Sequence, residues 1–77
     1  LTIRAAGLVR IEPEALTITR QRTPAGFVYT DAEGRRINDQ AILERIRLLA
    51  IPPAYEDVRI AADPRAHIQA LGRDQAG

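Results

Sequence analysis

Arginine is the residue type in this chain whose number and placement could do chemistry. All eleven cations are arginine and none is lysine, and a guanidinium can donate two parallel hydrogen bonds to a phosphate or a base edge. Arg20 and Arg22 are spaced to share one side of an extended segment, and Arg35 and Arg36 follow a turn. Such a set could grip phosphates. A solvated polar surface is the alternative, and codon bias in a GC-rich genome also explains the absence of lysine.

Other chemistry is poorly represented in the sequence. The chain has no serine or cysteine to act as a nucleophile and a single histidine, His67, which argues against a metal site. Neither of the glycine-rich phosphate-binding motifs occurs, so no nucleotide cofactor is expected. Three carboxylate pairs fall in predicted turns or near the amino end, where solvation explains them: Glu12 with Glu14, Asp31 with Glu33, and Glu56 with Asp57. We therefore predict no catalytic residue, no metal and no cofactor.

Length and composition indicate one small globular domain. The chain has 77 residues, 45% of them apolar, and a net charge of +1, which is too close to neutral to argue for nucleic acid by itself. The absence of cysteine and of an apolar run of roughly 20 residues predicts a cytoplasmic protein with no membrane span. The first residue is leucine and the polar end stops on glycine, so we expect a piece of a larger protein.

Alternating and β-branched residues predict strands on either side of two turns. Residues 16–22 are expected to form the first strand, 26–30 the second and 35–37 the third. Residues 31–34, Asp-Ala-Glu-Gly, form the turn between the last two, which ends in a glycine suited to a left-handed backbone. The second and third strands should form a hairpin.

A helix is expected over residues 40–50. Asn38 and Asp39 offer an N-cap, and Pro52-Pro53 stops the helix. Its apolar residues recur at helical spacing, whereas Arg45 and Arg47 fall outside that stripe. The members of the stripe are Ile42, Ile46 and Leu49.

A second hairpin is expected from residues 58–62 and 67–71. Pairing Ile60 with Ala70 places the apolar side chains on one face, and Arg59, Gln69 and His67 on the other. A slip of one residue would mix polar and core positions, so the first register is preferred.

The predicted fold class is therefore α+β: an antiparallel sheet of about five strands with one main helix packed on one face and a polar, open second face. Residues 1–14 are expected to be a mostly flexible leader, with a possible short edge strand near Leu8–Ile11. Residues 15–77 are expected to be a small β-rich domain.

The order of motifs from residue 16 to residue 77 resembles the amino-terminal domain of the bacterial, poxvirus-like type IB DNA topoisomerases. The motifs are Ile18-Thr19-Arg20-x-Arg22, Gly26-Phe27-x-Tyr29-x-Asp31-x-x-Gly34, Leu43-x-Arg45-Ile46-x-x-Leu49-x-Ile51-Pro52-Pro53-Ala54-Tyr55-x-Asp57-Val58-x-Ile60 and Asp63-Pro64-x-x-His67-Ile68-Gln69-Ala70-x-Gly72-Arg73-Asp74. Two positions depart from the family pattern: Tyr55 stands where a tryptophan is usual, and Ala25 where a basic residue is common.

The resemblance implies a non-catalytic DNA-clamp domain of an enzyme that relaxes supercoiled DNA through a 3′-phosphotyrosine. The catalytic residues of such an enzyme belong to a separate carboxyl-terminal domain, so no catalytic residue carries over to this chain. The implied partners are duplex DNA, bound weakly by this piece, and that catalytic domain; we expect a monomer that associates with the nucleoid. The expected DNA contacts are Arg20, Arg22, Arg35, Arg36, Gln69 and Arg73. A protein-interaction module that docks through its sheet face or edge remains the alternative.

Overall fold

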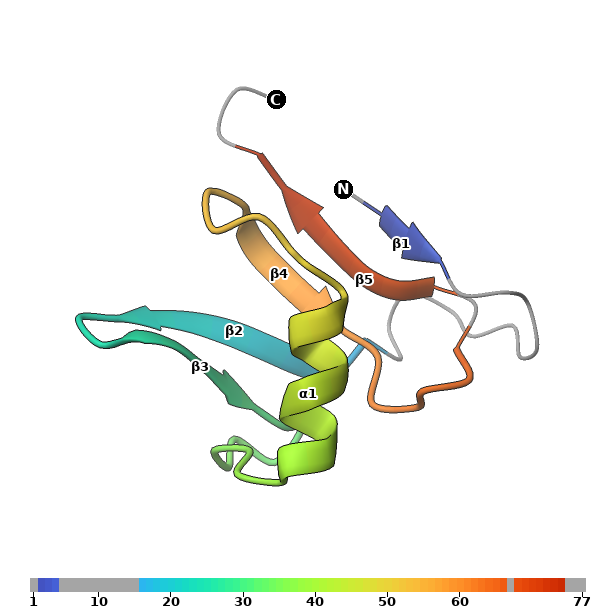
Figure 1. The fold of residues 1–77 in the computed structure, drawn as a ribbon, viewed down its shortest axis with the longest axis horizontal. Coiled ribbons are helices and arrows are strands. Elements are labelled where there is room, and N and C mark those ends of the chain that lie inside the picture. Colours follow the sequence, from blue (N-terminus) through green and yellow to red (C-terminus); the bar gives the residue numbers. More distant parts are fainter. Residues whose placement is uncertain (1, 5–15, 67, 75–77) are drawn as a thin grey trace.

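One antiparallel sheet with a helix on one side makes up the part of the protein that the computed structural model describes, residues 2–4, 16–66 and 68–74 (Figure 1). The sheet has the order β1-β5-β4-β2-β3. Its strands are β1 (Thr2–Arg4), β2 (Ile18–Thr23), β3 (Gly26–Thr30), β4 (Glu56–Ile60) and β5 (Ile68–Arg73). The α+β class is confirmed, and four of the five predicted strands are present.

The β2–β3 hairpin closes on a two-residue turn, Pro24-Ala25. Thr23 pairs with Gly26, whose φ of 128° lies outside the range that side-chain-bearing residues readily adopt. The Thr23 hydroxyl donates to the Gly26 carbonyl at 2.9 Å and reinforces the turn. The hairpin extends away from the rest of the sheet as an arm (Figure 1).

The predicted third strand, residues 35–37, is wrong. This segment makes a single bridge, between Arg36 and Thr30, and the Ile37 N–H donates to the Tyr29 carbonyl at 2.8 Å. The Asp31 turn forms as expected, because the Asp31 carboxylate accepts from the backbone N–H groups of Glu33 and Arg35. The pairing with β3 does not continue beyond Arg36, because the Ile37 side chain is buried in the core and the helix cap, Asp39, follows two residues later.

Helix α1 spans Gln40–Leu48 and begins where the sequence predicts. The Asp39 carboxylate caps it by accepting from the N–H groups of Ala41 and Ile42 at 2.9 and 3.3 Å. The helix ends two residues earlier than predicted, since Leu49 is its C-cap and Ala50 has a φ of 54°. Because Ala50 adopts a left-handed conformation, the helix ends before the chain reaches Pro52-Pro53.

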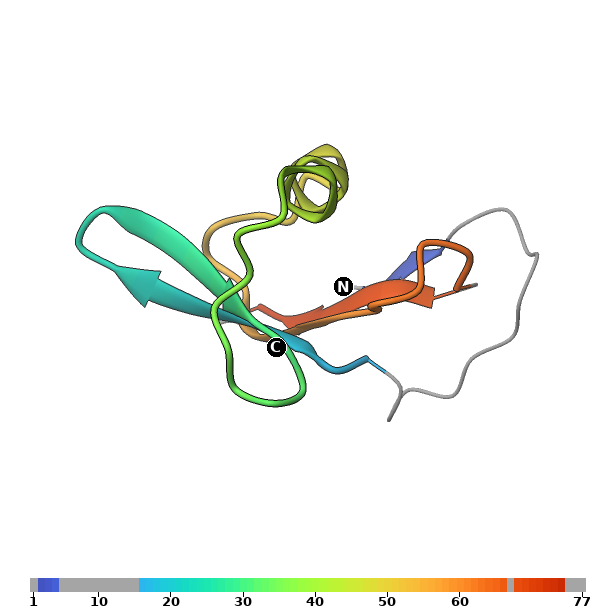
Figure 2. The ribbon, with the colours of Figure 1, turned by 90° about the horizontal axis from the view of Figure 1, so that it is seen from below.

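The main core lies between α1 and one face of the sheet (Figure 2). Ile60 and Ala70 are fully buried and face each other across β4 and β5, in the register that the sequence predicts. Leu43, absent from the predicted stripe, packs against this core together with the stripe residues. The buried members are Ile18, Ile37, Ile46, Val58, Ile60 and Ala70.

A smaller apolar cluster lies at the end of the sheet where β4 and β5 are connected. Ala61 and Ala66 are fully buried in it with Leu16, and Ile68 and Leu71 pack against them. Because Ala61 follows the core residue Ile60, its side chain is directed away from α1.

Of the predicted leader, residues 1–14, the structure describes residues 2–4. Thr2–Arg4 forms the edge strand β1, which pairs with β5. The predicted edge strand near Leu8–Ile11 lies outside the described residues, as does the side chain of His67.

Candidate nucleic-acid interface

The sheet surface that faces away from α1 carries a continuous row of paired side chains. Neighbouring strands pair Arg36 with Thr30, Thr30 with Thr19, Thr19 with Arg59, and Arg59 with Leu71. Paired residues project on the same face, and Thr19 follows the core residue Ile18, so this row lies opposite the helix. We call this surface the open face. It comprises Thr19, Gln21, Val28, Thr30, Arg36, Arg59, Leu71 and Arg73.

A polar cluster occupies the centre of the open face. The Thr19 and Thr30 hydroxyl oxygens are 2.8 Å apart, and the Gln21 Nε2 donates to them at 2.7 and 3.2 Å. The Gln21 Oε1 is buried and has no hydrogen-bond partner among the described residues. The cluster thus holds an unused acceptor, and the hydroxyl pair keeps one donor that can turn toward a ligand.

Arg20 and Arg22 lie on the other side of the sheet, where their guanidinium groups hold the segment after α1. Arg20 Nη2 donates to the carbonyls of Pro52 and Tyr55 at 3.1 and 2.8 Å, and Arg22 Nη2 donates to the Pro53 carbonyl at 2.6 Å. Both guanidiniums also lie over the ring of Phe27, at 4.1 and 5.0 Å from its centroid. These two predicted contact residues therefore bind the hairpin arm to the proline segment.

Substitution of Arg20 should destabilise the domain. Arg20→Ala removes charge-assisted hydrogen bonds to two carbonyls and the contact with Phe27, and we expect a loss of about 1–2 kcal/mol in the free energy of unfolding, measured in urea. Arg20→Lys should recover little of it, because an ammonium cannot reproduce the planar fork. The matched control is Arg35→Ala on the exposed turn; equal stability of the two alanine variants would contradict the assigned role.

Arg35 and Arg36 are both exposed in the segment after β3, at the end of the hairpin opposite the Pro24-Ala25 turn. The Arg35 backbone belongs to the Asp31 turn, and its carbonyl accepts from the Asp31 N–H at 2.9 Å. Arg36 lies on the open face through its bridge to Thr30. The structure thus separates the four arginines that the sequence groups together, placing Arg20 and Arg22 on one side of the sheet and Arg36 on the other.

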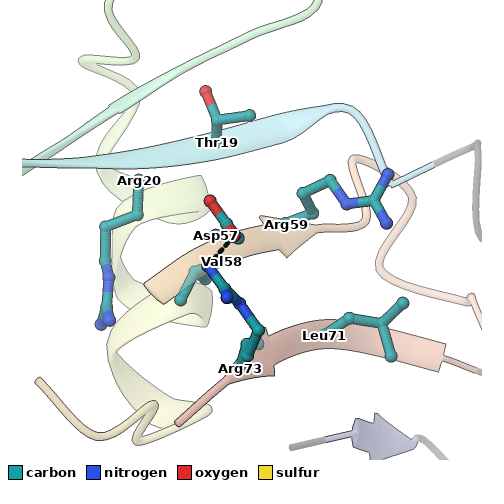
Figure 3. A pocket seen from close by; sticks show the side chains of 8 residues that line it. Thr19, Arg20, Asp57, Val58, Arg59, Leu71 and Arg73 are labelled. Atoms are coloured by element: carbon teal, nitrogen blue, oxygen red, sulfur yellow. Dashed lines mark hydrogen bonds and ion pairs between the residues drawn. The ribbon is translucent and has the colours of Figure 1, made fainter. Parts of the chain in front are cut away.

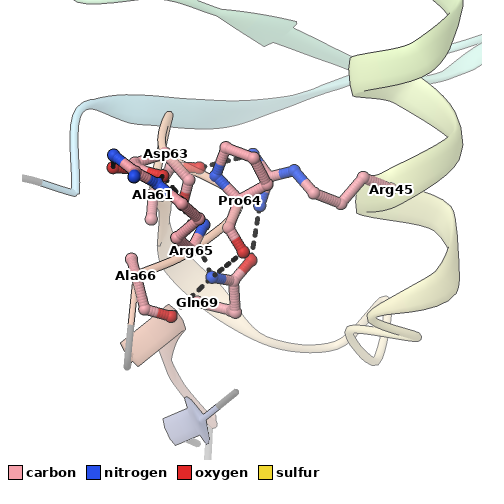
Figure 4. Close-up of polar contacts among 7 residues, drawn as sticks. All are labelled: Arg45, Ala61, Asp63, Pro64, Arg65, Ala66 and Gln69. Carbon is pink, nitrogen blue, oxygen red and sulfur yellow. Dashed lines mark hydrogen bonds and ion pairs between the residues drawn. The ribbon is translucent and has the colours of Figure 1, made fainter. Parts of the chain in front are cut away.

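Gln69 differs most from its expected position. It is 4% exposed, whereas the pairing pattern predicts a place on the open face. Its Nε2 donates to the carbonyls of Ala66 and Pro64 at 2.6 and 3.2 Å, and its Oε1 accepts from Arg45 Nη1 at 2.5 Å (Figure 4). The physical cause is a register irregularity, because Ile3 and Arg4 of β1 pair with residues 70 and 68 of β5 and leave Gln69 out of the alternation.

Arg45 reaches from α1 to the same point and completes this network. Its Nη2 donates to the Ala61 carbonyl at 2.6 Å. Burial lowers the pKa of the Arg45 guanidinium, and the Asp63 carboxylate partly offsets this effect. The pKa of Asp63 is lowered chiefly by its hydrogen bonds from the Arg65 side chain and backbone N–H, which hold the turn that presents carbonyls to Gln69. Gln69 and Arg45 therefore join the helix to the β4–β5 connection.

Arg59 and Arg73 line a pocket between β2 and β4 that the sequence does not suggest; it opens on the open face, and Arg20 and Val58 line it from the α1 side. Figure 3 shows Arg73 extended toward Asp57, while Arg59 extends along β4 in the other direction. Arg59 is exposed, and no side chain within residues 16–66 or 68–74 pairs with it. The alternation Val58-Arg59-Ile60 placed it on the open face, but nothing in the sequence distinguished it from a solvated cation.

Two findings limit other kinds of site in the described part of the chain. No group of three His, Asp or Glu side chains there could hold a metal ion. Its helix is too short to cross a membrane.

The fold and the site define a small α+β domain with arginines distributed over one open sheet face. The family model described as the amino-terminal domain of bacterial DNA topoisomerase IB matches residues 26–74. DNA topoisomerase 1B of Acanthamoeba polyphaga mimivirus is 37% identical over 60 residues, which cover 78% of this chain and 18% of that protein. The chain therefore belongs to the family of bacterial type IB topoisomerase amino-terminal domains. It spans less than a fifth of the length of this curated relative, and no solved structure matches it.

Proposed function

We propose that this chain is the DNA-contacting, non-catalytic domain of a type IB DNA topoisomerase, and that the open face is the surface that meets the duplex. The observation that carries the proposal is the row of paired residues across that face. Arg36 and Arg59 lie three strand spacings apart in it, about 14 Å. This separation of the two backbone positions is close to the ~12 Å width of the major groove, so long side chains at these positions suit phosphates on its opposite sides.

The polar cluster between the two arginines supports the same orientation. Thr19, Gln21 and Thr30 lie between Arg36 and Arg59, where side chains would meet the groove floor. Hydroxyl and amide groups hydrogen-bond base edges. Arg20, Arg22 and Gln69, whose polar groups serve the domain's own structure, do not belong to the proposed contact set, whereas Arg36 and Arg73 remain in it.

In the whole protein, this domain would hold one side of the duplex while a catalytic domain of the same chain closes the other. The complete enzyme would relax supercoils through a 3′-phosphotyrosine. That linkage conserves the energy of the broken phosphodiester bond, so religation needs no ATP. The tyrosine nucleophile would belong to the catalytic domain, and such a protein would act as a monomer in the cytoplasm with the nucleoid.

An NMR titration with duplex DNA at low salt tests the proposal. We expect binding with a dissociation constant on the order of 10⁻⁴ to 10⁻⁶ M, shifts concentrated on the open face, and affinity that falls steeply with salt. Arg36→Ala should reduce the slope of log affinity against log salt by about 0.9, the value for one phosphate contact.

Arg47→Ala is the matched control, because Arg47 is an exposed arginine on α1, on the other side of the sheet. It should leave the slope unchanged. Shifts that cluster on α1, or no binding, would refute the proposed interface. Binding to a polypeptide that does not depend on salt would favour the protein-interaction alternative.

A further inference from the structure

The pocket on the open face forms where two neighbouring strands separate. Strands β2 and β4 pair at Ile18 with Ile60 and at Thr19 with Arg59, and their register goes no further. The space left between the diverging strands has a volume of about 650 Å³. Thr19 and Arg59 form one end of it, and Asp57 and Arg73 form the other (Figure 3).

The backbone of β4 is shaped to bring an acid into this pocket. The pairing of β4 with β5 shifts between Glu56 and Arg59, and Asp57 in the shifted stretch has a φ of 51°. A left-handed conformation is unfavourable for residues other than glycine, although aspartate and asparagine tolerate it best. The irregularity directs the Asp57 carboxylate toward Arg73 and against the alternation of the strand.

Asp57 occupies the position that an anionic ligand would take. Its Oδ2 lies 2.5 Å from Arg73 Nη2, and the Glu56 Oε2 lies 3.7 Å from the same atom. The three side chains are 75%, 61% and 52% exposed for Asp57, Arg73 and Glu56. An exposed pair of this kind is weak and can exchange for another anion. Arg59, in the same pocket, has no anion to exchange among the described residues.

We propose that this pocket is a subsite for one backbone phosphate of duplex DNA, held by Arg59 and Arg73, with the Asp57 carboxylate competing for Arg73 in the free domain. The two guanidiniums supply donors for the phosphate oxygens. On binding, Arg73 leaves Asp57, Arg59 turns back from its direction along β4, and both guanidiniums reach the phosphate. The inference rests on the proposed DNA-binding function and identifies both the ligand group and the residue that opposes its binding.

Asp57→Asn is the decisive substitution. Asparagine tolerates the left-handed backbone as well as aspartate does, so the strand irregularity should survive. Removal of the competing charge should raise the affinity for a short duplex about fivefold at low salt. Arg59→Ala and Arg73→Gln should each weaken binding and reduce the salt slope by about 0.9.

Glu44→Gln is the matched control, since it removes one negative charge from the exposed side of α1. It should change the affinity by much less than Asp57→Asn does. An equal gain in the two variants would reduce the role of Asp57 to its contribution to net charge and would overturn the proposal.

The guanidinium Nε–Hε signals of Arg59 and Arg73 report occupancy directly. We expect both to shift with duplex, and to shift little with inorganic phosphate at the same phosphate concentration. Saturation by inorganic phosphate at equal or higher affinity would assign the pocket to a free phosphate ion instead. If the duplex binds while these signals and the Asp57→Asn affinity stay unchanged, the subsite is wrong and the DNA interface stands. If the unmodified domain does not bind duplex, the proposed function fails as well.

Discussion

Gln69→Ala should lower the free energy of unfolding by about 2–4 kcal/mol. The substitution removes the donor to the buried Ala66 carbonyl and to the Pro64 carbonyl, and it removes the acceptor of Arg45 Nη1. A buried polar group left without a partner costs about 1–3 kcal/mol, and Arg45 is already partly desolvated. A domain of this size has roughly 3–5 kcal/mol of total stability. The variant should therefore retain only about 1 kcal/mol, so that roughly a sixth of the molecules are unfolded at 25 °C.

Urea denaturation of three variants separates the possible causes of this loss. Gln69→Leu keeps most of the side-chain volume and should lose nearly as much stability as Gln69→Ala, because the hydrogen bonds and not the packing are decisive. Gln40→Ala, at the exposed first residue of α1, is the control and should stay within about 0.5 kcal/mol of the parent. A stable Gln69→Ala variant with weakened DNA binding would instead support the groove contact that the sequence predicts.

Ile60→Ala should cost about 3–4 kcal/mol, the second large effect. Ile60 is 0% exposed and is the largest fully buried side chain among the described residues. It lies in the central strand β4, with Ile18 of β2 on one side and Ala70 of β5 on the other. Truncation loses the transfer free energy of three carbons and leaves a cavity that the flanking strands cannot close.

The loss of Ile60 should appear as a lower urea midpoint and a lower melting temperature. Ile60→Val should cost about 1 kcal/mol. Val28→Ala on the half-buried outer side of β3 is the control, and we expect it to cost less than Ile60→Ala by at least about 2 kcal/mol. Similar losses for the two alanine variants would show that the core does not lie where the structure places it.

Local signals account for the elements that the sequence predicts correctly. Helix α1 starts at an acceptor side chain, Asp39, that is followed by apolar residues at helical spacing, and Pro52-Pro53 limits its length. Both signals can be read from the sequence because capping and proline geometry act over only a few residues. The pairing of Ile60 with Ala70 also follows from the sequence, since a slip of one residue would move the apolar side chains of both strands to the solvent face.

The fate of residues 35–37, the surroundings of Arg20 and Arg22, and the position of Gln69 all depend on contacts between distant segments. Residues 35–37 carry a strand pattern, but Ile37 is drawn beneath α1, and one bridge is all that remains of the predicted pairing. Arg20 and Arg22 alternate as a contact pair should, yet carbonyls more than 30 residues away along the chain engage them. Gln69 leaves the open face because of a register irregularity that no residue type nearby indicates.

The sequence by itself therefore determined the family, the fold class, the helix, the strands β2 and β3 and the presence of arginines suited to phosphate, whereas the hairpin that it predicted, between residues 26–30 and 35–37, did not form. Residue types and short spacings carry that information. Only the tertiary structure decided which arginines have their donors used within the domain and which face solvent. A guanidinium at Arg20 and one at Arg59 are chemically identical, and their availability depends on whether the folded chain brings a carbonyl within hydrogen-bond distance. That distance is set by long-range packing, which is why Arg59 emerged as a candidate contact and Gln69 as a structural residue.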